Sequence, residues 1–315
     1  MSVRIGINPI TWTNDDLPEL GAETPLEVCL AEGKKAGYAG FELGHKFPRQ
    51  SSTLGPILES HQLNLVSGWY SSRLLERSAE EEIEAMQGHL TLLKELGSNV
   101  MVYCEVSESI HGDRQIAVRN RPVMSEAQWH TLLQRIEVVG QYLQSEGVSL
   151  AYHHHMGTVI ESEADVDRLM AGTSDAVGLL LDSGHLTYAG ADPVAVAKRH
   201  ANRIRHVHCK DIRGSVMLDA KNRAMSFLDA VLNGVFTVPG EGDVDYLAIF
   251  KVLKESKYSG WLVVEAEQDP SVAHPLSYAN LGYKNLKNLC AEANLEVLGY
   301  HPNSDLANSL TAVSP

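Results

Sequence analysis

Residues that could bind a metal stand at the ends of apolar segments in the second half of the chain. These segments cover 148–152, 177–182, 204–208 and 260–265. The residues at or just after their ends are His153, His155, Asp182, His208 and Glu265. Imidazole and carboxylate groups that meet in an apolar interior would repel one another or lack partners unless a cation lay between them. Mixed nitrogen and oxygen ligands suit Mn, Co, Fe or Zn, and they argue against Ca and against a thiolate zinc site.

Each of these residues also has a purely structural interpretation. The histidines at 153–155 could open a polar loop, and Asp182 could cap a helix. His208 could be a hydrogen-bonded core histidine, and Glu265 could lie on the rim. The metal interpretation is favoured because four consecutive apolar segments end in a ligand-type residue. Side chains alternate along a strand, so His153 and His155 share one face and either could be the ligand.

Further residues near these positions predict acid–base chemistry and substrate binding. His155, His185 and Glu267 are candidates for a general base, and Lys210 or one of the same histidines is the candidate for a general acid. The substrate-binding candidates are two tryptophans that could wall a sugar ring, one carboxylate that could bind a hydroxyl and one tyrosine that could line the pocket, namely Trp12, Trp69, Glu42 and Tyr103. Packing between helices is the alternative for the tryptophans.

Alternating strands and helices must position these side chains. Short apolar runs predict eight strands, at 3–10, 39–44, 63–69, 99–104, 148–152, 177–182, 204–208 and 260–265. Helical patterns lie between and after them, at 24–36, 52–61, 79–96, 125–146, 162–171, 192–200, 224–233, 243–256 and 275–291. At the first helix, Thr24 is expected as the N-cap and Pro25 as the first helical residue.

The repeated strand–helix unit predicts an α/β fold of the (β/α)8 TIM-barrel type. Units of about 30 residues are βα repeats, and eight of them close a barrel whose active site lies at the carboxyl ends of the strands. A doubly wound open sheet is the alternative, but it usually has a glycine-rich phosphate loop after its first strand, unlike Asn8-Pro9-Ile10-Thr11. We expect one barrel domain over 1–300 and a C-terminal tail over 301–315.

Composition excludes several other classes of protein. The 315 residues carry a net charge of −14, which disfavours nucleic acid and anionic membranes as partners. No apolar run approaches the roughly 18 residues of a membrane helix, and the first residues do not resemble a signal peptide. The four cysteines have no CxxC spacing, so a disulfide framework is not expected. We therefore expect the protein in the reducing cytoplasm.

The motifs at the segment ends resemble those of the xylose-isomerase-like barrels. That family places Glu, Asp, His and Glu on a metal at the ends of strands 5 to 8, and the matching residues here are His153, Asp182, His208 and Glu265. Further matches are Asp182-x-x-His185, His208-x-Lys210-Asp211, the stretch 239–245, and Gly260 five residues before Glu265. The chain departs from the family at strand 5, where a Glu-Asn-His motif is replaced by three histidines.

Within that family, the chain resembles the dehydratases of bacterial inositol catabolism over positions 1–300. The most specific stretches are 6–12, 152–158 and 261–270. The resemblance implies removal of water from 2-keto-myo-inositol, a polyol ketone, to give a trihydroxycyclohexane dione, with Mn²⁺ or Co²⁺ and glutathione as cofactors. It also allows a homo-oligomer, because related barrels often pair. The alternative activity is a keto-sugar or inosose isomerase or epimerase at the same metal site.

Overall fold

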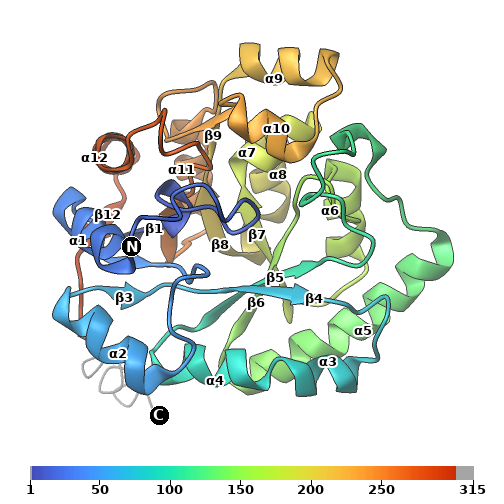
Figure 1. The fold of residues 1–315 in the computed structure, drawn as a ribbon. Coiled ribbons are helices and arrows are strands. Elements are labelled where there is room, and N and C mark those ends of the chain that lie inside the picture. Colours follow the sequence, from blue (N-terminus) through green and yellow to red (C-terminus); the bar gives the residue numbers. More distant parts are fainter. Residues whose placement is uncertain (1, 303–315) are drawn as a thin grey trace.

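The computed structural model describes residues 2–302, and its centre is a closed parallel sheet (Figure 1). The strands follow the order β3-β2-β1-β11-β8-β7-β6-β5-β4. Their bounds are β1 (Ser2–Ile7), β2 (Gly40–Phe41), β3 (Asn64–Leu65), β4 (Trp69–Ser72), β5 (Val100–Glu105), β6 (Ser149–His153), β7 (Val177–Asp182), β8 (Ile204–Cys209) and β11 (Trp261–Val264).

The barrel closes within the third predicted strand. The two ends of the strand order, β3 and β4, are consecutive pieces of one stretch and are separated only by residues 66–68. The amide of Val66 donates to Phe41 on one side, and the carbonyl of Gly68 accepts from Val102 on the other, at 2.8 and 3.0 Å. All eight predicted strand positions are therefore present, and the (β/α)8 architecture is confirmed.

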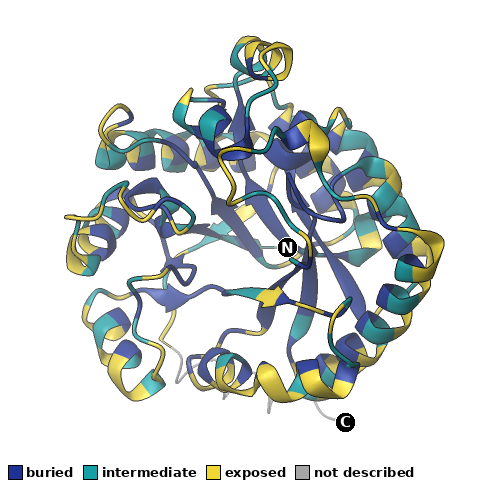
Figure 2. Ribbon diagram, turned by 45° about the vertical axis from the view of Figure 1, so that its right-hand side comes forward, coloured by how far each residue is buried: buried dark blue, intermediate teal, exposed yellow. Residues whose placement is uncertain are grey.

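An outer layer of helices covers the sheet, and their inward faces form the main core (Figure 2). These helices are α1 (Leu26–Ala36), α2 (Ser51–Ser60), α3 (Ala79–Ala85), α4 (Gln87–Glu95), α5 (Glu126–Ser145), α6 (Glu163–Ala171), α8 (Pro193–His200), α11 (Tyr246–Glu255) and α12 (Pro275–Glu292). Within the barrel itself, smaller apolar clusters fill the interior below the carboxyl ends, among them Val66, Trp261 and Val263. None of the helices within residues 2–302 combines the length and apolar character that a bilayer crossing requires.

Several elements differ from the sequence-based expectation. Helix α1 begins at Leu26 with Pro25 as its N-cap, so the prediction of Thr24 as the cap is wrong by one residue. The helix predicted at 79–96 is two helices that meet at Met86. Helix α1 ends at Ala36, as the pattern at 24–36 predicted, and the next residue, Gly37, has a φ of 113° that other residues rarely adopt.

At the carboxyl ends of the barrel strands, the structure has elements that hydrophobic periodicity did not reveal. Short helices α7 (Ser183–Ala189) and α9 (Gly214–Asn222) were not predicted, and α10 (Phe227–Leu232) is shorter than the expected 224–233. Strands β9 (Asp211–Ile212) and β10 (Phe236–Thr237) form a separate antiparallel pair beside them, and these pieces rise above the barrel in Figure 1. A further strand, β12 (Glu296–Leu298), pairs with β1. Most of the tail predicted at 301–315 lies outside the described residues.

Alternation along each strand decides which residues reach the barrel interior at its carboxyl end. In β6, Ala151 packs inside the barrel, so His153 two positions later points the same way. The same step leads from Leu180 to Asp182 in β7 and from Val263 to Glu265 after β11. Residues from three separate strands thus converge on one ring above the apolar filling.

Candidate metal centre

Four side chains meet at the carboxyl end of the barrel with the spacing of a metal site. One nitrogen or oxygen atom from each of His153, Asp182, His208 and Glu265 lies within 4.8 Å of the others, and all four residues are buried. His153 Nε2 is 3.3 Å from Asp182 Oδ2, and His208 Nδ1 is 2.8 Å from Glu265 Oε2. The structure therefore brings together His153, rather than His155, with the three other predicted ligands.

Unused polar atoms in this cluster fit a cation. His208 Nδ1 and Glu265 Oε2 are buried and lie 2.8 Å apart, and neither makes a hydrogen bond of good geometry within the described residues, although Lys210 Nζ is 3.3 Å from Glu265 Oε2. A buried polar atom without a partner costs free energy, and two such atoms side by side point to a shared ligand. Two imidazoles and two carboxylates suit a divalent transition metal and match the donor set expected from the sequence.

The charges around His208 also favour a cation at this point. Burial alone would lower the pKa of His208, but the nearby carboxylates of Glu265 and Glu42 outweigh it and raise the pKa well above its usual value. Burial would raise the pKa of Asp182, but His208 and Lys210 beside it lower that pKa to about 2. Burial and neighbouring positive charge lower the pKa of His153, so this imidazole is neutral, as a metal ligand must be.

Glu42 holds His208 from the side opposite the cluster. Its Oε1 accepts from His208 Nε2 at 3.1 Å and from His206 Nε2 at 2.8 Å. Ser67 donates to the same oxygen at 2.5 Å, and Asn8 donates to Oε2 at 2.8 Å. These bonds place the proton of His208 on Nε2 and leave Nδ1 free to face the metal cluster.

A second group of residues has metal-like spacing but is explained by hydrogen bonds. Glu42, His206 and His208 also lie within 4.8 Å of one another. Because the carboxylate of Glu42 already accepts from four donors, its oxygens are satisfied without an ion. Only the first group is therefore retained as a candidate metal centre. Glu42 itself, predicted to bind a substrate hydroxyl, is used in holding His208.

Lys210 links the metal cluster to the remaining candidates for acid–base chemistry. Its ammonium lies 3.3 Å from Glu265 Oε2, 3.1 Å from Glu267 Oε2 and 3.2 Å from His185 Nε2. Burial would lower the pKa of Lys210, but Glu265 and Glu267 outweigh it and raise the pKa above its usual value. His185 in turn packs against His155, with ring centroids 4.0 Å apart. The four predicted acid–base residues are therefore adjacent.

A cavity of about 230 Å³ opens onto the metal cluster. Two of the proposed ligands, His153 and Glu265, reach it, and so do His155, Glu267 and Trp69. The sequence analysis did not single out the other polar lining residues, which are Asn8, Asp15, Asp16, Ser71 and His111. Asn8 ends the first strand and could have been found by the same criterion as the ligands. Ser71 lies in β4, just beyond the predicted strand at 63–69, and the remaining three lie in loops, which have no periodic signal.

Two predicted substrate-binding residues lie away from this cavity. Trp12 is buried in the core, where its ring packs near Phe41 and its indole nitrogen donates to Glu32 at 2.6 Å. Tyr103 is also fully buried and belongs to the core cluster between sheet and helices. Its position in β5 directs its side chain out of the barrel, toward the helices. Neither residue lines the cavity, so both assignments are corrected. For Trp12, the alternative of packing between elements was the right one.

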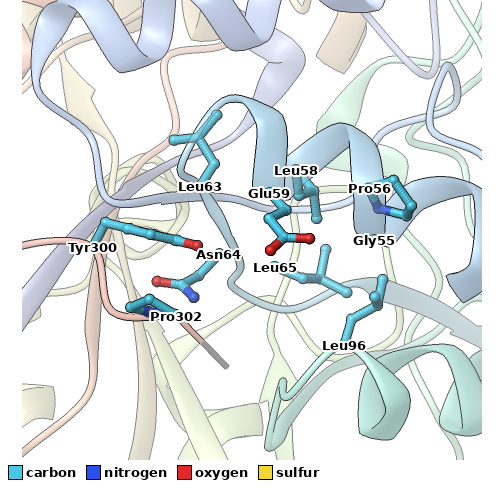
Figure 3. A pocket seen from close by; sticks show the side chains of 10 residues that line it. All are labelled: Gly55, Pro56, Leu58, Glu59, Leu63, Asn64, Leu65, Leu96, Tyr300 and Pro302. Atoms are coloured by element: carbon cyan, nitrogen blue, oxygen red, sulfur yellow. The ribbon is translucent and has the colours of Figure 1, made fainter. Parts of the chain in front are cut away.

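Figure 3 shows a different hollow, formed by α2 and the segment of Tyr300 and Pro302. Its volume is about 310 Å³, larger than the cavity at the metal cluster. Glu59 is the only carboxylate among its lining residues, and none of the proposed metal ligands or acid–base residues reaches it. Size alone is therefore a poor guide to the active site in this protein.

Fold and site together define a (β/α)8 barrel with a candidate metal site at the carboxyl ends of its strands. Residues 30–280 match the sequence profile of the xylose isomerase-like TIM barrel family. The chain belongs to this family, and the resemblance seen in its motifs is confirmed.

Individual relatives are similar to this chain over most of the length of both proteins. The chain is 51% identical over 293 residues to the rhizopine catabolism protein MocC of Rhizobium meliloti, covering 93% of this chain and 90% of that protein. It is 42% identical over 280 residues to an inosose dehydratase of Bacillus thuringiensis, covering 88% and 94%. A crystal structure of the IOLI protein with a zinc atom has the same fold, with a TM-score of 0.63, 17% identity and coverage of 92% and 98%.

Proposed function

We propose that this protein is a metal-dependent hydro-lyase that dehydrates 2-keto-myo-inositol to 3D-trihydroxycyclohexane-1,2-dione in inositol catabolism. The observation that carries the proposal is the buried group of His153, Asp182, His208 and Glu265 beside a cavity with acid–base residues. The inosose dehydratases, which are 42–43% identical over most of both chains, support the choice of substrate.

The reaction removes one hydrogen and one hydroxyl from neighbouring carbons. The α-carbon beside the ketone loses its hydrogen, and the next carbon loses hydroxide, which leaves as water after protonation. The resulting enol carries the α-hydroxyl and tautomerises to the 1,2-dione. A divalent cation at the four ligands would act as a Lewis acid toward the ketone oxygen and so make the α-hydrogen more acidic.

Glu267 and His155 are our candidates for moving these protons, because both line the cavity. Glu267 Oε2 is held by Lys210 at 3.1 Å, and its other oxygen is 3.4 Å from Asn14 Nδ2. His155 Nδ1 is 2.9 Å from the carbonyl oxygen of Met156, so its Nε2 is the nitrogen left for the substrate. Lys210 and His185 do not line the cavity, and we assign them to holding these two groups.

The charge of the cavity supports an uncharged polyol rather than a phosphorylated sugar. Asp15 and Asp16 stand at the cavity with Glu265 and Glu267, and none of the lining residues is Lys or Arg. A phosphate group would meet repulsion there, whereas hydroxyl groups could donate to the carboxylates. Trp69 offers an apolar face for the ring, in line with the sequence-based expectation.

The decisive experiment is an assay of the purified chain with 2-keto-myo-inositol after loading with Mn²⁺ or Co²⁺. We expect absorbance from the dione product, and we expect none from the Asp182→Asn variant. Glutathione is tested as an additive, since only the family resemblance implies it. Metal-loaded protein that makes no dione would overturn the proposal.

An isomerase or epimerase at the same centre is the second candidate. It shares the removal of a proton beside a carbonyl group but retains the hydroxyl, and barrels with the same fold include an L-ribulose 3-epimerase. NMR of the reaction mixture distinguishes the two, because an epimerised ketose without dione would support the second activity. Because the relative with 51% identity is named for rhizopine catabolism, rhizopine is assayed alongside.

A further inference from the structure

A hollow of about 380 Å³ opens at the amino-terminal end of the barrel, at the opposite end from the metal cluster. It is formed by the first residues of β1, β5, β6, β8 and β11 and by the loops that lead into them. Its volume lies within the range of about 300–1,000 Å³ typical of small-ligand pockets. The proposed function does not use it.

Positive charge without a carboxylate partner distinguishes this hollow. Arg4, Arg205 and Lys257 line it, and none of the lining residues is Asp or Glu. Within residues 2–302, none of these three side chains makes an ion pair, although the whole chain has 40 acidic and only 26 basic residues. Unpaired cations gathered in one place create a local positive field that attracts anions.

Arg4 is held in place without use of its hydrogen-bond donors. Its guanidinium carbon lies 4.3 Å from the centroid of the Trp261 ring, which fixes the plane of the guanidinium by a cation–π contact. No hydrogen bond joins this guanidinium to another residue in the described part of the chain. The donors of a half-buried, ordered arginine are thus available to a ligand.

Arg205 is placed at the hollow by an irregularity in the sheet. Leu179 pairs with Ile204 and Leu180 pairs with His206, so Arg205 is an extra residue between two consecutive pairs. A β-carbon on Gly178 would come within 2.2 Å of Arg205 Cγ, which means that this glycine makes room for the arginine. One guanidinium nitrogen, Nη1, donates to the carbonyls of Asn202 at 2.8 Å and of Ile204 at 3.5 Å, and the donors on Nε and Nη2 remain.

Neutral donors surround the charged groups. Ser149, Asn99 and Asn202 line the hollow, and their side chains make no hydrogen bond to another described residue. Guanidinium, ammonium, hydroxyl and amide groups together form a donor-rich site with no carboxylate acceptor. A tetrahedral dianion with several oxygens matches such a site better than a neutral ligand does.

We propose that this hollow binds a small phosphate-type oxyanion, either free inorganic phosphate or the phosphate group of a small metabolite. Arg4 and Arg205 provide forked donors, and Lys257 contributes a third positive charge. The anion lies at the end of the barrel away from the metal cluster, so it does not compete with the proposed substrate. Its binding joins strand ends that are distant in sequence and so stabilises the folded barrel.

The test measures thermal unfolding and calorimetric binding with inorganic phosphate and with glycerol 3-phosphate, against sodium chloride at equal ionic strength. We expect saturable stabilisation by at least one phosphate compound. Tighter binding of the ester identifies a metabolite, and tighter binding of phosphate identifies the free ion. The substitution Arg205→Gln should weaken the affinity at least about ten-fold, as expected for loss of a charge-assisted contact.

Matched variants locate the anion. Arg223→Gln makes the same change of charge at the exposed C-cap of α9, where Arg223 pairs with Asp219 at the other end of the molecule, and should leave the affinity unchanged. Lys257→Met serves as a second variant if Arg205→Gln does not fold. Three results would each overturn the proposal: no stabilisation beyond that of chloride, equal losses in Arg205→Gln and Arg223→Gln, or loss of binding in Asp182→Asn, which would place the anion at the metal cluster.

Discussion

The two ends of this barrel carry opposite charges on the same strands. Strand β8 carries Arg205 near its start and His208 near its end, and β1 carries Arg4 near its start and is followed directly by Asn8. At the carboxyl end, carboxylates and imidazoles converge and leave unpaired atoms that call for a cation. At the amino end, guanidinium and ammonium groups gather without carboxylates. A single set of parallel strands can therefore build two sites of different chemistry.

The strands set where each side chain lies, whereas its burial and the charges beside it decide whether it is ionised. Glu265 and Glu267 are two residues apart and both are fully buried, yet their pKa values move in opposite directions. Burial raises the pKa of Glu267 to about 7, and Lys210 only partly opposes this. For Glu265, the nearby His208 and Lys210 outweigh burial and lower the pKa.

The largest expected effect comes from removing a metal ligand. Asp182→Asn should abolish metal binding and lower turnover by on the order of 10³-fold or more, because the Lewis acid is lost. Metal content after dialysis and turnover are the measurements. Asp175→Asn, a change at an exposed carboxylate, is the control and should retain both. Full metal occupancy with wild-type turnover in Asp182→Asn would show that the ligand assignment is wrong.

The next effect separates metal binding from proton transfer. Glu267→Gln keeps the shape of the side chain but removes the acid–base group, so turnover should fall by about 10²–10⁴-fold while metal content is retained. Metal analysis and turnover are measured on the same sample. Loss of metal in this variant would instead make Glu267 a ligand. His185→Ala should likewise retain metal and lose turnover, since His185 packs against His155.

A third prediction concerns Glu161, a carboxylate near the carboxyl end of the barrel whose burial outweighs the nearby Arg121. Burial raises the pKa of Glu161 to about 7, although the Gly157 amide and Arg121 oppose this. Because the folded pKa exceeds the unfolded value, this group should cost stability as pH rises from about 4.5 to 7, by on the order of 2–3 kcal/mol at pH 8.

Glu161→Gln removes that titration. The variant should gain stability over the wild type at pH 8 and lose this advantage at pH 4.5, as measured by urea unfolding at both values. A stability difference that does not depend on pH would contradict the assigned pKa. Glu296→Gln, at an exposed position of β12, is the control and should not change the pH dependence.

A smaller effect is expected when the support of His208 is weakened. Glu42→Gln places an amide group against the imidazole donors of His206 and His208. His208 is then held less firmly, so the metal dissociation constant should rise by roughly 10–100-fold. Competition with a chelator measures this constant, and unfolding of the metal-free protein checks that the fold is intact. Glu59→Gln, at an exposed site, should leave the constant unchanged. A change in Glu42→Gln of less than about three-fold would remove Glu42 from this role.

The smallest effect tests the amino end. Gly178→Ala should lower the free energy of unfolding by about 1–3 kcal/mol, because the new β-carbon would crowd Arg205 Cγ and the carbonyl oxygen of Leu150. Gly88→Ala is the matched control, since no atom lies within 4 Å of its added carbon. Urea unfolding compares the two variants. An unchanged stability for Gly178→Ala would mean that Arg205 is not held as described.

Local patterns in the sequence determined the elements and the ends of the strands. Apolar runs bounded by polar residues indicated eight strands, and the residues at the ends of four of them, His153, Asp182, His208 and Glu265, are the ones the structure brings together. This succeeds because strand periodicity is local and because parallel strands in a barrel all end at one rim. Short pieces without periodicity, such as α7 and α9, could not be found in this way.

Tertiary structure alone decided which partners these side chains meet. The choice of His153 over His155, the role of Glu42 beside His208, and the burial of Trp12 all depend on contacts between residues far apart in the chain. The same holds for the amino end, where Arg4, Arg205 and Lys257 come together only once the barrel closes. Hydrophobic periodicity in the sequence predicts which face of a strand a residue occupies. Only the closed sheet decides which residues of other strands lie opposite that residue.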